Sequence, residues 1–247
     1  MKKYTYWLMA ALMVFSTFSV ALANEPDEEA AFLQQVTAIM QDYDSDPEAA
    51  EAALAELDAE LVGEPQTQTV PSGSPATRST MPTDYRLMVY ALKRGGQSYY
   101  HLIWNLDAEE KETDCGSLDY VSIEWDTSRA RYYSSRGDNN YSTVRGRSDG
   151  IVLFNLQDQD MNAGSLAAGS VQVTPIVAGE MEYGSKFAHT YTVTENVVTS
   201  TTQFVSSAAA SADPSLGLSY TDSYTVTTSQ REYVWYLWDD NAATMHL

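Results

Sequence analysis

The chain of 247 residues carries 34 acidic and 14 basic side chains, so its formal net charge is −20 at pH 7. A charge of this sign excludes nucleic acid and anionic membrane surfaces as partners chosen by electrostatic attraction. Cys115 is the only cysteine, which excludes an internal disulfide and leaves the hydrophobic core to hold the fold.

Residues 1–23 have the pattern of a secretory signal peptide. Two lysines precede an apolar run at residues 7–15, and the sequence Ala-Leu-Ala at 21–23 has the small residues of a cleavage site. The apolar run is shorter than the roughly 20 residues of a membrane-spanning helix. We therefore expect cleavage after Ala23 and a secreted or periplasmic mature chain with no stable transmembrane span.

Residues 24–62 are predicted to form an acidic helical hairpin. Between residues 24 and 64 there are 13 acidic side chains and no basic one. Asp46 and Pro47 are an N-cap and a first-turn proline for the second helix. The apolar stripes at helical spacing comprise Phe32, Val36, Ile39, Met40 and Tyr43 in the first helix, and Leu54, Leu57 and Leu61 in the second.

The rest of the chain is predicted to be mainly β. Residues 63–83 contain four prolines and few apolar side chains, so we expect an extended linker there. From residue 84 the apolar period becomes that of a strand. About ten such segments, separated by turn residues, predict that residues 84–247 form an antiparallel β-sandwich. One apolar row comprises Tyr100, Leu102, Trp104 and Leu106.

Catalytic chemistry has little support in the sequence. No nucleophile-elbow, metalloprotease or phosphate-loop motif occurs. His101 and His189 lie in predicted strands, where they are either half-buried strand residues or, if they meet, ligands of a metal or a catalytic base. Cys115 follows Asp114, and a neighbouring carboxylate disfavours a thiolate nucleophile. We expect a protein without enzymatic activity; a hydrolase with an unrecognised site is the alternative.

Three aspartates in predicted loops are candidate calcium ligands. Asp138 lies in the sequence RGDNN, and Asp158 and Asp160 lie in QDQDMN. Oxygen-rich loops of this kind bind calcium weakly in extracellular modules, although solvated turns have the same composition. No other cofactor is predicted.

Residues 193–229 contain three acidic side chains, no basic one, and many Ser and Thr among apolar residues. The overlapping segment TVTTSQREYVWYL, residues 225–237, is similar to a strand of leukocidin-type pore-forming proteins, which implies a hairpin that enters a membrane. The residues themselves favour an ordinary sheet, because Glu195 and Asp222 interrupt the apolar rows that lipid contact requires. We predict two paired strands that do not insert, joined by residues 206–216.

The expected function is therefore binding or a structural role in the cell envelope or extracellular space. The 17 tyrosines and five tryptophans suit a platform on which sugar rings stack, and equally suit half-exposed strands. A protein or a glycan is the expected ligand. A pore-forming protein that inserts a β-hairpin is the first alternative, and the hydrolase is the second.

Overall fold

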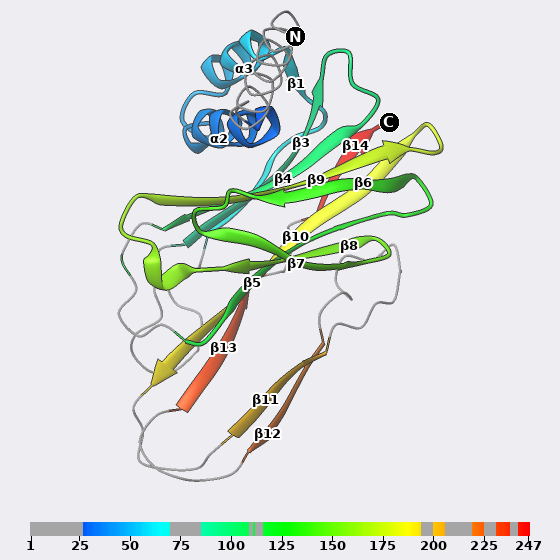
Figure 1. The fold of residues 1–247 in the computed structure, drawn as a ribbon. Coiled ribbons are helices and arrows are strands. Elements are labelled where there is room, and N and C mark those ends of the chain that lie inside the picture. Colours follow the sequence, from blue (N-terminus) through cyan, green and yellow to red (C-terminus); the bar gives the residue numbers. More distant parts are fainter. Residues whose placement is uncertain are drawn as a thin grey trace, which may run out of the picture. The chain divides into compact units, whose positions relative to one another are not determined.

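The computed structural model of the protein describes residues 27–69, 85–108, 111, 116–193, 200–205, 219–224, 231–237 and 242–247, with residues 191–237 described by their backbone alone (Figure 1). The chain divides into two compact units, residues 1–32 and 33–247. The predicted signal peptide, residues 70–83 of the predicted linker and Cys115 lie outside the described residues.

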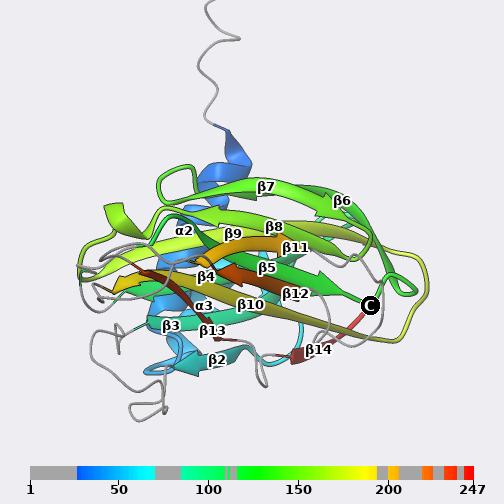
Figure 2. The same cartoon turned by 90° about the horizontal axis from the view of Figure 1, so that it is seen from below.

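Two antiparallel sheets form a sandwich in the second unit. The first has the strand order β1-β3-β4-β9-β6, with β2 also paired to β3. The second has the order β13-β10-β5-β8-β7, with β14 also paired to β10. Strands of both sheets run in similar directions (Figure 2), as in aligned sheet packing. The predicted mainly β antiparallel fold with N-terminal helices is confirmed.

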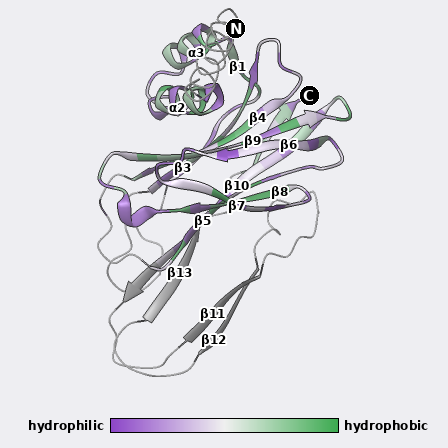
Figure 3. Ribbon diagram, viewed as in Figure 1, coloured by the Kyte–Doolittle hydropathy of each residue, from purple (hydrophilic) through white to green (hydrophobic). Residues whose placement is uncertain are grey.

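All the strands of the two sheets except β1 and β2 lie within residues 84–247, the range predicted to be β. The first sheet contains β1 (Ala59–Leu61), β2 (Gln66–Thr69), β3 (Tyr85–Arg94), β4 (Tyr100–Ala108), β6 (Ala130–Gly137) and β9 (Ser165–Pro175). The second contains β5 (Asp119–Trp125), β7 (Ser142–Ser148), β8 (Ile151–Leu156), β10 (Glu180–Val193), β13 (Arg231–Leu237) and β14 (Ala242–His246). Hydrophilic residues gather in the turn after β8, which contains the short helix η1 (Asp158–Asp160) (Figure 3).

The core lies between the two sheets and is built from alternate residues of their strands. Leu102, Trp104 and Leu106 of β4 are fully buried there, as their predicted row requires. The rings of Trp104 and Phe154 meet edge to face, with centroids 5.5 Å apart. Gly169 of β9 lies directly against Trp104, where a Cβ atom would overlap the indole. Glycine at this position therefore lets the largest core side chain fit.

Two helices precede the strands, α2 (Glu28–Gln41) and α3 (Pro47–Glu56). Asp46 caps α3 by accepting a hydrogen bond from Ala49 N at 3.1 Å, as predicted. The second helix is shorter than predicted, because Asp58 takes a left-handed backbone conformation with φ 55°. Residues 59–61 then pair with β3 as β1, so Leu61 belongs to a strand.

Residues 33–57 lie against the outer face of the first sheet. Asn105 Nδ2 of β4 donates to Thr37 O at 3.4 Å, and Arg86 Nη1 of β3 donates to Gln41 O at 3.1 Å. Arg86 also pairs with Asp44 at 3.3 Å. Tyr90 is buried in the same layer, where desolvation raises the pKa of its hydroxyl. These contacts give the second unit three layers.

Part of the predicted linker is extended, as expected, but it is paired as a strand of the first sheet. Residues 66–69 form β2, which pairs with β3 from Gln66–Val89 to Thr69–Arg86. The cause is the open edge of β3, because an edge strand offers unpaired backbone groups that a passing extended segment can satisfy. A sequence rich in Thr and Gln extends readily, and its pairing could not be deduced from composition.

Strand β10 is long enough to pair with three other strands. Residues 180–184 pair with β14, residues 183–188 with β5, and residues 187–193 with β13. Beyond Ala188, β10 therefore leaves β5 and continues with β13. None of the helices in the described residues has the length and apolar character needed to span a membrane.

A separate two-stranded sheet follows β10 in the chain, formed by β11 (Ser200–Val205) and β12 (Ser219–Tyr224). The prediction of two paired strands between residues 193 and 229 is confirmed by this ladder. The sheet is two-stranded, however, and no other described strand pairs with it. Residues 206–216, the predicted connection, lie outside the described residues.

Candidate functional site

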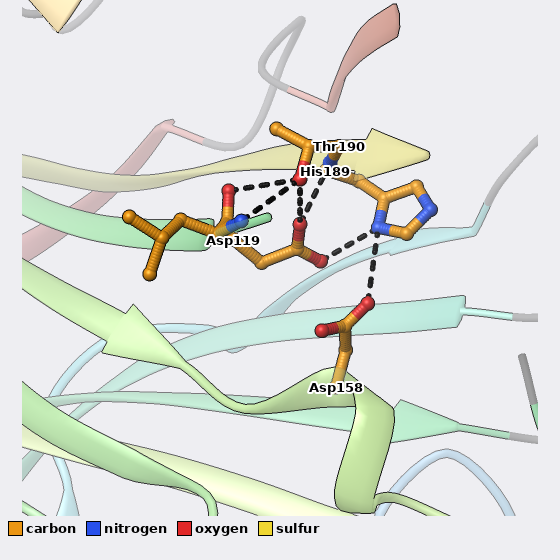
Figure 4. A network of polar contacts seen from close by, with 5 residues as sticks. Asp119, Asp158, His189 and Thr190 are labelled. Carbon is orange, nitrogen blue, oxygen red and sulfur yellow. Dashed lines mark hydrogen bonds and ion pairs between the residues drawn. The ribbon is translucent and has the colours of Figure 1, made fainter. Parts of the chain in front are cut away.

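Three polar side chains converge at one end of the sandwich interior: Asp119, Asp158 and His189 (Figure 4). Strand alternation places them there. Asp119 continues the core row of β5 that contains Val121, and His189 continues the core row of β10 that contains Phe187. Asp158 opens η1, directly after β8. The apolar core therefore ends in a polar cluster.

Asp119 is the hydrogen-bonding centre of this cluster. Its Oδ2 lies 2.6 Å from His189 Nδ1. Its Oδ1 accepts from Thr190 N at 2.7 Å and lies 3.2 Å from Thr190 Oγ1. Asp119 is completely buried, and the cost of burying a carboxylate falls when donors of this kind surround it. Its orientation is thus fixed from two sides.

Asp158 approaches the same imidazole nitrogen from another element. Its Oδ2 lies 3.8 Å from His189 Nδ1, and the side chains of His189 and Asp158 are only 1% and 7% exposed. Two aromatic rings flank the imidazole: the centroids of Tyr85 and Phe187 lie 5.5 and 5.7 Å from that of His189. The ring is therefore held between apolar walls, with Nδ1 directed to both carboxylates.

The predicted calcium ligands do not come together. Asp138 uses its carboxylate for the backbone: Oδ1 accepts from the N–H groups of residues 140–142 at 2.8–2.9 Å, and Oδ2 accepts from Ala168 N at 2.8 Å. Asp160 is exposed on η1. Only Asp158 belongs to a group of potential metal ligands, and within the described residues that group is Asp119, Asp158 and His189. Calcium binding stays a prediction.

His101 and His189 lie in different sheets. His101 is on β4, on the side opposite the core row of Leu102 and Trp104. Its Nδ1 lies 3.4 Å from Ser170 Oγ and its Nε2 lies 3.3 Å from Gln97 Oε1. The structure therefore does not join the two histidines in one site. The carboxylates beside His189 are Asp158, a predicted calcium ligand, and Asp119, which the sequence did not indicate.

A second buried polar group lies on the opposite face of β5 and β10. Lys186 Nζ is 3.2 Å from Glu124 Oε1, and their side chains are 5% and 11% exposed. Ser122 Oγ adds a contact of 3.4 Å to the same carboxylate oxygen. The opposite charges of Lys186 and Glu124 balance each other, so we interpret the pair as a structural contact between the neighbouring strands β10 and β5.

Acid is expected to destabilise the protein through His101. Desolvation, followed by repulsion from Arg94 and Lys93, lowers the pKa of this imidazole to about 4 from its ordinary 6.5. The unfolded chain binds the proton first, so stability is intact above pH 6.5 and falls as the pH drops from 6.5 to 4. A shift of this size corresponds to a loss of about 3 kcal/mol.

The measurement is urea unfolding of wild type and His101→Gln at pH 7.5, 5.5 and 4. Carboxylates elsewhere contribute to acid destabilisation in both proteins, so only the difference between their pH profiles reports His101. We expect wild type to lose more stability than the variant over this range. Parallel profiles would contradict the assignment.

Comparison with known proteins gives only remote likenesses. No protein-family model and no curated protein sequence matches this chain. The chain is similar to the sixth cohesin of Acetivibrio cellulolyticus scaffoldin B, solved with a Cel5 dockerin, at 12% identity and a TM-score of 0.29 over 37% of this chain and 77% of the cohesin.

Two toxins of Clostridium perfringens are also similar. The NetB toxin in its membrane inserted form has 6% identity and a TM-score of 0.33 over 73% of this chain and 97% of the toxin. Delta-toxin has 7% identity and a TM-score of 0.33 over 77% and 97%. These are weak structural resemblances to cohesin binding modules and leukocidin-type toxins, and they assign no function.

Proposed function

We propose that this protein is a non-enzymatic β-sandwich protein that acts on lipid bilayers through the hairpin that begins in β10 and ends in β13. The observation that carries the proposal is a shared register. Val193 pairs with Arg231 and Ser200 pairs with Tyr224, so partner numbers add to 424 in both ladders. Six residues separate the two ladders in each arm of the chain, namely 194–199 between β10 and β11 and 225–230 between β12 and β13. Equal spacing is what one long hairpin requires.

The energetics of a two-stranded sheet support a role outside the sandwich. An isolated hairpin is marginally stable in water, and both of its outer edges expose unpaired backbone groups. In the ladder of β11 and β12 the paired residues include Phe204 with Tyr220 and Thr202 with Asp222. These two pairs are two positions apart in the ladder, so they belong to the same face of the sheet. The charge of Asp222 interrupts that face, and its protonation would be needed before the face could contact lipid. Copies of the hairpin side by side would satisfy the edges.

This function is tested by asking whether substitutions at alternate residues of β11 reduce dye leakage from vesicles. Each residue from 200 to 205 is replaced singly by Asp, and dye release is measured from neutral and anionic vesicles at pH 7 and pH 5. The lower pH is included because protonation of Asp222 and Glu195 removes charges that oppose insertion. We expect wild type to release dye and the variants to lose activity at alternate positions. No release from any vesicle, or a loss without alternation, contradicts the proposal.

Ligand binding on the first sheet is the second candidate. Tyr133 lies at a bulge in β6, is 59% exposed, and stacks on Tyr99 with ring centroids 4.9 Å apart. An exposed stacked tyrosine suits a sugar ring or a protein side chain. Titration with neutral oligosaccharides, followed by tyrosine and tryptophan fluorescence, should give saturable binding that Tyr133→Ala abolishes. Binding unchanged by Tyr133→Ala would contradict this surface.

A further inference from the structure

We infer that Asp119, Asp158 and His189 form a binding site for a divalent transition-metal ion of the zinc class. Each residue offers one ligand atom, and these atoms lie within 4.8 Å of one another. Each comes from a different element, namely β5, η1 and β10. The inference is independent of the proposed action on membranes.

The distances suit a small ion better than a large one. Zinc binds imidazole nitrogen and carboxylate oxygen at about 2.0–2.2 Å in tetrahedral geometry, which sets neighbouring ligand atoms roughly 3.4 Å apart. Here His189 Nδ1 is 2.6 Å from Asp119 Oδ2 and 3.8 Å from Asp158 Oδ2, so the two distances bracket that separation. The ion takes the place of the proton between Asp119 and His189, and the pair opens by less than about 1 Å.

The ligand types favour the same class of metal. One imidazole with two carboxylates is a set used by zinc and its first-row neighbours, whereas calcium prefers six to eight oxygen ligands. The two carboxylates carry a charge of −2, which a divalent cation balances within the cluster. Because the side chains are almost fully buried, this balance is stronger than it would be in water.

Surrounding contacts hold the ligands in place. Thr190 N and Thr190 Oγ1 engage Asp119 Oδ1, which leaves Oδ2 directed to the site. Tyr85 and Phe187 flank the imidazole. Partners of this kind orient the ligands of metal sites, and their loss lowers metal affinity by about 10–100-fold. The fourth ligand position would be taken by water.

The test uses the mature chain without an affinity tag, dialysed against chelator. Zn²⁺ is titrated by calorimetry, and Co²⁺ is titrated while its visible absorption is followed, since that absorption reports nitrogen and oxygen coordination. We expect one ion per chain and a raised Tm with bound metal. Asp158→Asn and His189→Gln should each weaken binding by roughly tenfold or more.

Two matched controls separate this site from surface binding. Asp160→Asn alters the exposed neighbour of Asp158 on η1, and His246→Gln removes a histidine that is 78% exposed and lies 3.6 Å from Glu180. Both should bind as wild type does. Circular dichroism of each metal-free variant establishes folding, and if His189→Gln does not fold, Asp158→Asn decides. Absent binding, or binding unchanged in Asp158→Asn, overturns the inference.

Discussion

Deletion of residues 27–57 is expected to abolish cooperative unfolding of the sandwich. Four apolar side chains of this segment within the second unit are almost fully buried, namely Leu33, Val36, Met40 and Leu54. Burial of such side chains is worth about 1.5–3 kcal/mol each, so together they match the roughly 5–15 kcal/mol stability of a whole domain. Deletion also exposes Tyr90 and removes a partner of Asn105.

A point variant makes the same test with less disturbance. Leu54→Asn places an amide at a buried position of α3, whereas Glu51→Asn changes an exposed position on the same helix. Thermal unfolding followed by near- and far-ultraviolet circular dichroism should show a Tm lowered by several degrees or more for Leu54→Asn, and little change for Glu51→Asn. Equal Tm values, together with cooperative unfolding of the deletion variant, would show that the helices are dispensable.

Composition alone would indicate a separate helical part that could be removed without loss of the sandwich. The acidic charge of residues 24–64 and the prolines after residue 63 mark a change in composition, which usually accompanies a domain boundary. Composition does not record long-range contacts. The outer face of the first sheet is as buried as its core face, with Tyr90 and Ile103 both at 0% exposure. Such a two-sided strand signals that a further layer must cover it.

The candidate site could not be predicted from the sequence for a different reason. The core rows of β5 and β10 follow strand alternation, and extending each row by one step reaches Asp119 and His189. Their contact still depends on the pairing of β5 with β10, which joins residues 70 positions apart in the chain. Pairing over that distance is set by the whole topology, so the sequence could identify His189 as a strand residue without naming its partner. Asp158 was singled out only for its oxygen atoms.

The register of the hairpin was likewise beyond the sequence. Alternation within residues 193–229 suggested two strands. An alternating pattern shows which residues of one strand share a face, but it does not show which residues of the two strands are paired. A shift of one residue would exchange the faces of an entire arm. The ladder of β11 and β12 opposes Thr202 to Asp222 and Ser200 to Tyr224. That register underlies the alternating leakage expected from the Asp substitutions.

Asp119→Ala is expected to cost about 3–5 kcal/mol of stability in metal-free buffer, because it breaks a buried, hydrogen-bonded pair. The change removes the acceptor 2.6 Å from His189 Nδ1 and 2.7 Å from Thr190 N, and leaves a void at a completely buried position. Unsatisfied donors in such a place cost about 1–3 kcal/mol each. Urea unfolding with chelator present measures the loss.

Asp126→Ala is the matched control for this substitution. Asp126 follows β5 and accepts a hydrogen bond from Ser128 N at 2.8 Å, but its side chain is only partly buried, so water can replace the lost partner and the loss should stay near 1 kcal/mol. A double-mutant cycle with His189→Gln then isolates the coupling between Asp119 and His189, which should exceed about 1 kcal/mol for groups in direct contact. If Asp119→Ala costs no more than Asp126→Ala, the cluster is not a stabilising contact. The polar end of the sandwich would then be retained at no gain in stability, as expected of residues kept for a ligand.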